Sequence, residues 1–215
     1  MATLTTRTTL TALEVVRSVE NVGQVVGDRL LVRQWHKRTD RSAMERWPRS
    51  ANPFLNLWKA VKPSEGPRMS WAIEHHAEQR LIGRITLRDI NEFDARLGIY
   101  LIDSFCGKGY GTESMLLFGR IFFGQLLFQL LRLDVAAANT PARRCYQRLG
   151  FRDVGRAWRS TPYDPALELL KLPEYQPQRA HYRQTLTGYE VRFCEMEISR
   201  AEWPVKFDQV RYASA

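Results

Sequence analysis

The chain has 215 residues, of which 44% are hydrophobic and 11% aromatic, enough for one domain with a buried core and extensions. This composition excludes a chain that is disordered throughout. The formal net charge of +9 would attract anions, but no block of five basic residues marks a nucleic-acid-binding tail.

Other composition features exclude further classes of protein. The three cysteines, Cys106, Cys145 and Cys194, are an odd number and predict no disulfide framework. The N-terminal residues lack the apolar core of a signal peptide, and the longest apolar stretch, residues 121–131, is too short and too polar to span a bilayer. The four histidines lack metal-site spacing, so we expect no metal. We expect a cytoplasmic protein.

The first half of the chain predicts an extension followed by strands. Residues 1–27 are Thr-rich and form an N-terminal extension. A helical region, residues 39–58, is interrupted at Pro48 and Pro53. The patterns of apolar residues predict strands at residues 30–34, 71–75, 81–87 and 95–102.

A glycine-rich loop follows the last of these strands. Residues 105–114 read Phe-Cys-Gly-Lys-Gly-Tyr-Gly-Thr-Glu-Ser, and the apolar run 115–131 after them predicts a buried helix. Glycines let a backbone approach a ligand closely, and a helix N-terminus offers free N–H groups and a positive dipole end. The order strand, glycine loop, helix therefore predicts a phosphate site. The spacing fits neither a Walker A loop nor a dinucleotide loop.

The second half alternates strands and a helix before a long insert. Pro141 favours a helix start and Gly150 a helix end. Residues 160–190 are polar, contain four prolines and are longer than ordinary loops. Strands are predicted at residues 131–136, 151–159 and 190–199, before a C-terminal tail at residues 206–215.

Two stretches resemble the signatures of one family. Residues 139–151 read Asn-Thr-Pro-Ala-Arg-Arg-Cys-Tyr-Gln-Arg-Leu-Gly-Phe. They resemble the pattern Asn-x-x-Ala-x-x-x-Tyr-x-x-x-Gly-Phe of the GCN5-related N-acetyltransferase (GNAT) superfamily. The glycine loop resembles that superfamily's pyrophosphate loop, Gln/Arg-x-x-Gly-x-Gly/Ala, except that Cys106 replaces Gln or Arg. The layout is most similar to the branch of ribosomal-protein-alanine N-acetyltransferases.

The resemblance implies an α/β fold with a central mixed, mostly antiparallel twisted sheet of about seven strands and helices on both faces. The acetyltransferase domain would span residues 28–205, with residues 160–190 as an insert. The implied reaction transfers an acetyl group from acetyl-CoA directly to a primary amine. The acceptor would be a peptide N-terminus, a polyamine or an aminoglycoside-like amine, and a homodimer remains open.

Specific residues take roles from the resemblance. Tyr146 matches the tyrosine that acts as general acid toward the CoA thiolate, and a phenol is protonated at neutral pH. Asn139 matches a CoA contact. Backbone groups near Leu101 and Ile102 would bind pantetheine, and the pyrophosphate would lie on Gly107, Lys108, Gly109, Tyr110, Gly111 and Thr112.

The general base is not marked in the sequence. Many relatives have Glu where this chain has Arg96, so the base would be an ordered water or one of Glu74, His75, His76, Asp89 and Asp103. A non-catalytic acyl-CoA sensor or scaffold is the alternative function, and nucleic-acid binding is a weaker third. We expect the insert to fold over the acceptor site, either in the same subunit or across a dimer, or to be a solvated loop.

Overall fold

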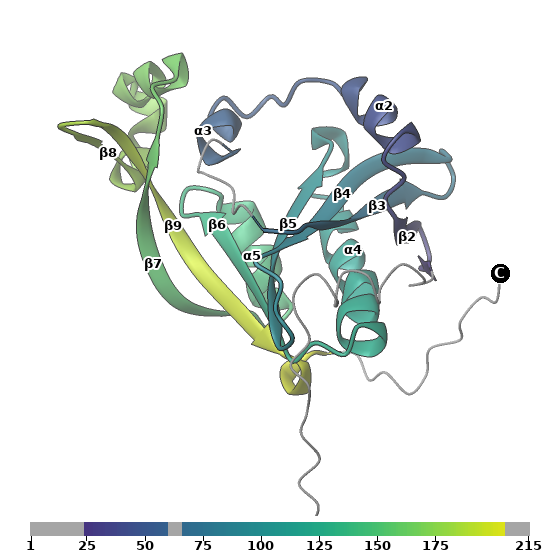
Figure 1. The fold of residues 1–215 in the computed structure, drawn as a ribbon. Helices are drawn as coiled ribbons and strands as arrows, with labels where there is room; N and C mark the ends of the chain where they lie inside the picture. The colour runs from purple at the N-terminus through teal and green to yellow at the C-terminus, as the bar shows by residue number, and fades with distance from the viewer. Residues whose placement is uncertain (1–23, 60–65, 205–215) are drawn as a thin grey trace, which may run out of the picture.

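The computed structural model describes residues 24–59 and 66–204, so most of the predicted extension and the predicted tail lie outside the described residues. Its strands form one mixed sheet in the order β1-β2-β3-β4-β5-β6-β9-β7, with β8 paired to β9 (Figure 1). The strands are β1 (Val25–Val26), β2 (Leu30–Gln34), β3 (Met69–His75), β4 (Arg80–Arg88), β5 (Asp94–Leu101), β6 (Leu130–Ala136), β7 (Arg152–Thr161), β8 (Tyr182–Thr185) and β9 (Gly188–Ser199).

Every predicted strand is found, and the α/β fold is confirmed. The short β1 and β8 raise the strand count above the predicted seven. The helices are α2 (Thr39–Glu45), α3 (Leu55–Lys59), α4 (Tyr110–Gly119) and α5 (Thr140–Arg148); the π-helical η2 (Arg120–Gln125) continues α4, and the 3-10 segments are η1 (Asp103–Phe105), η3 (Pro165–Lys171), η4 (Pro173–His181) and η5 (Arg200–Glu202).

Helices cover both faces of the sheet because strand residues alternate in direction. On one face, Trp71 of β3 packs edge-on against Phe118 of α4, with ring centroids 5.0 Å apart. On the other face, Trp47, which follows α2, stacks on Tyr100 of β5 at 5.4 Å. Trp71 and Phe118 are fully buried and belong to the main hydrophobic core.

Strands β5 and β6 pair over only part of their length. They form the one parallel pair of the described sheet, from Asp94↔Leu130 to Leu97↔Leu133. Beyond this point the last four residues of β5 pair only with β4, and the end of β6 pairs only with β9. The sheet therefore opens between the C-terminal ends of β5 and β6 (Figure 1).

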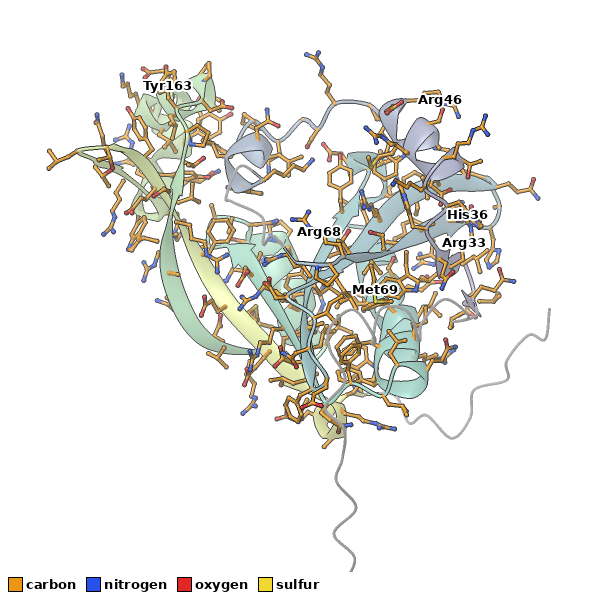
Figure 2. The ribbon with its side chains drawn as sticks, viewed as in Figure 1. Arg33, His36, Arg46, Arg68, Met69 and Tyr163 are labelled. Carbon is orange, nitrogen blue, oxygen red and sulfur yellow. The ribbon has the colours of Figure 1, made fainter. Side chains whose placement is uncertain are left out.

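The insert folds as a compact unit beside α3. It consists of η3, η4 and β8, and β8 forms a hairpin with β9. Its Leu167 and Tyr182 share a second hydrophobic cluster with Phe54 and Leu57 of the α3 region. Figure 2 shows Tyr163, which is 58% exposed, at the outer end of this unit. The insert is therefore ordered and is not a solvated loop.

Candidate active site

The glycine loop is held in a conformation that requires glycine. Gly107 and Gly109 have φ angles of 74° and 85°, in the left-handed region that side chains disfavour. Arg29 fixes the loop, because its Nη1 donates to the Lys108 carbonyl at 3.1 Å and its Nε to Glu113 at 2.8 Å. Since α4 starts directly after Gly109, its first N–H groups face the loop without intrahelical partners.

A cavity of about 840 Å³, here named the loop cavity, lies between this loop and α5. Arg144 and Arg148 of α5 line it one helical turn apart, and both are exposed. Sequence reasoning missed these two arginines, although their i, i+4 spacing beside the second signature indicated a shared helix face. Glycine backbone and two guanidinium groups suit a ligand with several phosphates.

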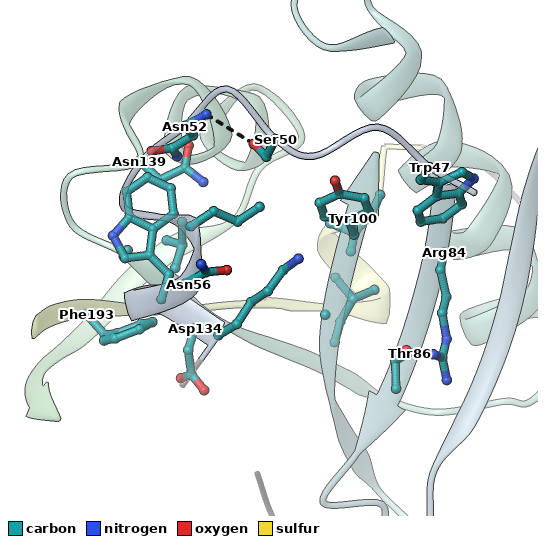
Figure 3. A pocket seen from close by; sticks show the side chains of 18 of the residues that line it. Trp47, Ser50, Asn52, Asn56, Arg84, Thr86, Tyr100, Asp134, Asn139 and Phe193 are labelled. Carbon is teal, nitrogen blue, oxygen red and sulfur yellow. Dashed lines mark hydrogen bonds between the residues drawn. The ribbon is translucent and has the colours of Figure 1, made fainter. Parts of the chain in front are cut away.

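A second cavity of about 860 Å³, here named the α3 cavity, lies at the same opening of the sheet. Figure 3 shows Trp47, Tyr100 and Arg84 on one side of it and Asp134 and Phe193 on the other. The two cavities share eight lining residues: Ser50, Asn52, Leu55, Trp58, Ile99, Tyr100, Asn139 and Tyr146. Two ligands bound in the two cavities would therefore meet at these residues.

Tyr146 stands where the cavities meet. Its side chain is 8% exposed, and its ring packs against Phe151 at 5.7 Å between centroids. Burial, and then the neighbouring Cys145, raise the pKa of Tyr146 above its usual value. No hydrogen bond to its hydroxyl is found among the described residues, and the residue lines both cavities.

Asn139 has two roles in the structure. Its Oδ1 accepts a 3.3 Å hydrogen bond from the Ala142 amide and so caps α5. It also lines both cavities. The helix that positions Tyr146 thus begins at a residue of the site.

The other predicted cofactor residues divide into two groups. Three of them, Ile102, Lys108 and Tyr110, do not line the loop cavity, whereas Leu101, Gly107, Gly109, Gly111 and Thr112 do. The Ile102 amide already donates to the Ile82 carbonyl at 2.9 Å and is not free for a ligand. The Tyr110 hydroxyl lies 2.9 Å from His75 Nε2, but the backbone N–H of Tyr110 belongs to the first turn of α4.

Among the five candidate bases, only Asp103 lines one of these two cavities, and it is the loop cavity. Its carboxylate accepts hydrogen bonds from Ser50 Oγ and the Ala51 amide. The other four are elsewhere: Glu74 pairs with Arg33, His75 contacts Tyr110, Asp89 pairs with Arg88, and His76 is exposed.

Asp134 is the carboxylate of the α3 cavity, and sequence reasoning missed it. Its side chain is 2% exposed and pairs with Arg88 at 2.7 Å, Arg159 at 2.9 Å and also Arg96. Burial opposes its ionisation, but hydrogen bonds from Arg159 and Arg88 and the charges of Arg159 and Arg96 lower the pKa of Asp134. It is therefore a poor proton acceptor. Arg96, which stands where relatives have Glu, is one of the three arginines.

The described residues favour neither a cysteine nucleophile nor a metal site. Burial, and then Asp103, raise the pKa of the Cys106 thiol, which disfavours a thiolate nucleophile. Within residues 24–59 and 66–204, no three His, Cys, Asp or Glu side chains gather as metal ligands. Over the same residues, no helix has the length and apolar character needed to cross a bilayer.

The insert lies outside both cavities. None of residues 162–192 is among the residues that line either one. The expectation that it covers the acceptor site within the same subunit is therefore wrong, because its apolar side chains are buried against α3. It contacts the cavity wall through the hydrogen bond from Trp58, which lines both cavities, to Tyr182.

Comparison with solved structures shows the same fold. Spermidine N-acetyltransferase from Vibrio cholerae, in complex with CoA and spermine, superposes with a TM-score of 0.60 at 17% identity, over 82% of this chain and 98% of that one. A GCN5-related N-acetyltransferase from Brucella melitensis has a TM-score of 0.60 at 16% identity, over 86% of this chain and 81% of that one. At such low identity these likenesses establish the fold alone.

Sequence comparison adds the family. The chain is 29% identical over 112 residues to the SPbeta prophage-derived uncharacterized N-acetyltransferase YokL of Bacillus subtilis (strain 168). The match spans 51% of this chain and 62% of that relative. The family profile described as an acetyltransferase (GNAT) domain matches residues 7–152, more than half of the chain. The chain therefore belongs to the GNAT acetyltransferase family, which confirms the superfamily that its two motifs predicted.

Proposed function

We propose that the protein is an acetyl-CoA-dependent N-acetyltransferase that moves the acetyl group directly to a primary amine in a ternary complex. The observation that carries this proposal is the meeting of two cavities at Tyr146 and Asn139, in the opening between β5 and β6. The loop cavity would hold acetyl-CoA and the α3 cavity the amine. Bound side by side, the two reactants gain the rate advantage of proximity.

The loop cavity fits CoA by the chemistry of its lining. The glycine loop and the α4 N-terminus would bind the pyrophosphate, and Arg144 and Arg148 would pair with phosphate oxygens. Leu101, at the unpaired edge of β5, would offer backbone groups to pantetheine, because β6 has diverged there.

Tyr146 would act as the general acid. When the amine attacks the thioester carbonyl, the carbon–sulfur bond breaks and the sulfur takes its electron pair. A buried phenol that is neutral at pH 7 would donate a proton to that sulfur. The ammonium proton of the acceptor would leave by water or toward Asp103, the one predicted base on a cavity wall.

The acceptor is the finer question. The resemblance to ribosomal-protein-alanine acetyltransferases favours a protein N-terminus, whereas the likeness to spermidine N-acetyltransferase is one of fold. The alternative of a non-catalytic acyl-CoA sensor is favoured by one observation: the carboxylate of the α3 cavity is bound to arginines.

Release of free thiol from acetyl-CoA in the presence of an amine mixture of peptides, polyamines and aminoglycosides tests the proposal. The expected result is amine-dependent thiol release, together with a rise in melting temperature on adding acetyl-CoA. A rise in melting temperature without turnover for any amine would favour the sensor.

A further inference from the structure

The charges on the wall of the α3 cavity are unbalanced. Its described lining residues include three cations, Arg49, Lys59 and Arg84, and one carboxylate, Asp134. That carboxylate is already surrounded by three other arginines, at 2.7 Å and 2.9 Å for Arg88 and Arg159. Its charge is therefore compensated before any ligand enters, and the remaining charge of the cavity is positive.

Arg84 shows the imbalance most clearly. Its Nε and Nη2 both donate to the neutral Ser70 hydroxyl, at 3.2 and 2.8 Å, and its guanidinium stacks on Trp35 at 4.5 Å. Its Nη1 has no partner among the described residues. Burial, and then the charge of Arg68, which precedes β3 (Figure 2), lower the pKa of Arg84. A partly buried cation without a carboxylate gains from an incoming anion.

Lys59 lies on the same cavity at the end of α3. Its Nζ is 4.3 Å from the centre of the Tyr100 ring, and it forms no ion pair with a described residue. Burial lowers the pKa of Lys59, which Asp103 partly offsets. Tyr100 lies opposite Arg84 in the pairing of β4 and β5, so the same aromatic residue neighbours both cations.

We propose that the acceptor amine carries an anionic group, a carboxylate or a phosphate, which binds to Arg84 and Lys59 while the amine faces the junction at Tyr146. This inference rests on the proposed N-acetyltransferase function and names its substrate class. Polycations such as polyamines and aminoglycosides are then poor acceptors, because three like charges oppose their entry. The acceptor preference thus differs from the spermidine named for a protein of the same fold.

Matched acceptor pairs test the inference on the full chain. O-phosphoethanolamine is compared with ethanolamine, the C-terminally amidated dipeptide Ala-Glu with amidated Ala-Gln, and spermidine serves as the polycation. The ethanolamine pair tests recognition of a phosphate, and the dipeptide pair tests recognition of a carboxylate. The expected kcat/KM favours the anionic member of at least one pair by about tenfold or more, as for a charge-assisted hydrogen bond.

Variants assign the preference to the cavity. Arg84→Gln should raise KM for the anionic acceptor, so that the ratio of kcat/KM between the anionic and the neutral acceptor falls toward one. Lys59→Gln, at the exposed end of a short helix, tests the same site without altering the sheet. Arg41→Gln is the control, because that side chain is 69% exposed, pairs with Glu45 and lines neither cavity.

The outcomes separate the inference from the proposed function. If neutral amines or spermidine are acetylated as fast as the anionic acceptors, or if Arg84→Gln and Lys59→Gln both retain the preference, the inference is wrong and the proposed function stands. If acetyl-CoA neither raises the melting temperature nor releases thiol with any amine, the proposed function itself is wrong.

Discussion

The indole Nε1 of Trp58 donates a 2.8 Å hydrogen bond to the hydroxyl of Tyr182, 124 residues later in the chain. Trp58 lines both cavities, and Tyr182 is the first residue of β8 in the insert. This contact connects the insert to the wall of the proposed acceptor site.

Tyr182→Phe removes that contact and should raise the acceptor KM while leaving acetyl-CoA affinity unchanged. The free energy of unfolding should fall by about 1 kcal/mol, the typical net contribution of such a hydrogen bond. Tyr163→Phe is the matched control, because Tyr163 is exposed on the same insert. Steady-state kinetics and urea denaturation measure both effects. An unchanged acceptor KM in Tyr182→Phe would show that the insert does not act on the site.

Gly111→Ala should retain both the fold and acetyl-CoA binding, because the family's loop pattern has Gly or Ala at this position. A Cβ at Gly111 would lie 3.7 Å from Leu101 Cδ1 and 3.8 Å from Cys145 Sγ, which are ordinary contacts. Alanine in the first turn of α4 should even stabilise the unliganded protein by about 0.5–1 kcal/mol. Thermal melts with and without acetyl-CoA measure both terms.

Gly109→Ala provides the contrast to that variant. Here φ is 85°, and the new Cβ would meet Arg29 Nη2 at 3.3 Å, so the unliganded protein should be destabilised. Opposite changes in melting temperature for the two glycine variants are therefore expected. Gly109→Ala should also weaken acetyl-CoA binding, because the loop pattern has only Gly at this position. Unchanged acetyl-CoA affinity in Gly109→Ala would remove the loop from the binding site.

Tyr146→Phe should lower kcat by roughly 10²–10⁴-fold if the hydroxyl is the general acid and chemistry limits turnover. The thermal shift on adding acetyl-CoA should change little, since the ring and its contact with Phe151 remain. Pre-steady-state thiol release identifies the chemical step. Wild-type rates in that step would reduce Tyr146 to a packing residue.

Asp134→Asn should destabilise the fold by about 3–5 kcal/mol, because it leaves three partly buried arginines without the buried carboxylate that they share. Asp89→Asn is the control, since that carboxylate is 41% exposed and its loss should cost at most about 1 kcal/mol. Urea denaturation distinguishes these values. Equal effects of the two substitutions would contradict the burial argument.

Asp134 also makes the free energy of unfolding depend on pH. The pKa of Asp134 is lower in the folded protein than in the unfolded chain, so its contribution is present above the unfolded value of about 4 and is lost as pH falls further. One group loses at most about 1.4 kcal/mol per pH unit, so the stability difference from Asp134→Asn should narrow by up to that amount between pH 4 and pH 3. Unfolding measured from pH 7 to pH 3 tests this convergence.

Local patterns in the sequence predicted most elements but not all their ends. The strand at residues 30–34 is found as predicted, because its apolar pattern matches its buried face. The predicted helix at residues 115–131 instead begins at Tyr110 and ends at Gln125, and Leu127 turns the chain with a φ of 61°. Helix and following strand are both buried and apolar, so hydrophobicity alone could not show where one ended.

The candidate-site residues that lie within one motif were predicted. Those that distant segments bring together were missed. Tyr146, Asn139 and the glycine loop come from two short stretches that the sequence shows directly. The arginine cluster around Asp134 joins four strands, β4, β5, β6 and β7, so no local pattern reveals it. The docking of the insert on α3 likewise depends on tertiary packing.

The short parallel pairing of β5 and β6 fixes the angle at which the unpaired ends of the two strands diverge. From Leu97, the last paired residue, to Leu101 the strand extends about 13 Å, at about 3.3 Å per residue. A rotation of about 5° at the paired end would thus move the open end by about 1 Å, a displacement that can change a reaction rate about a hundredfold. Residues of the paired segment, such as Ala95 and Leu131, are fully buried and line neither cavity, yet a change in their volume would alter the opening in which the two proposed reactants meet.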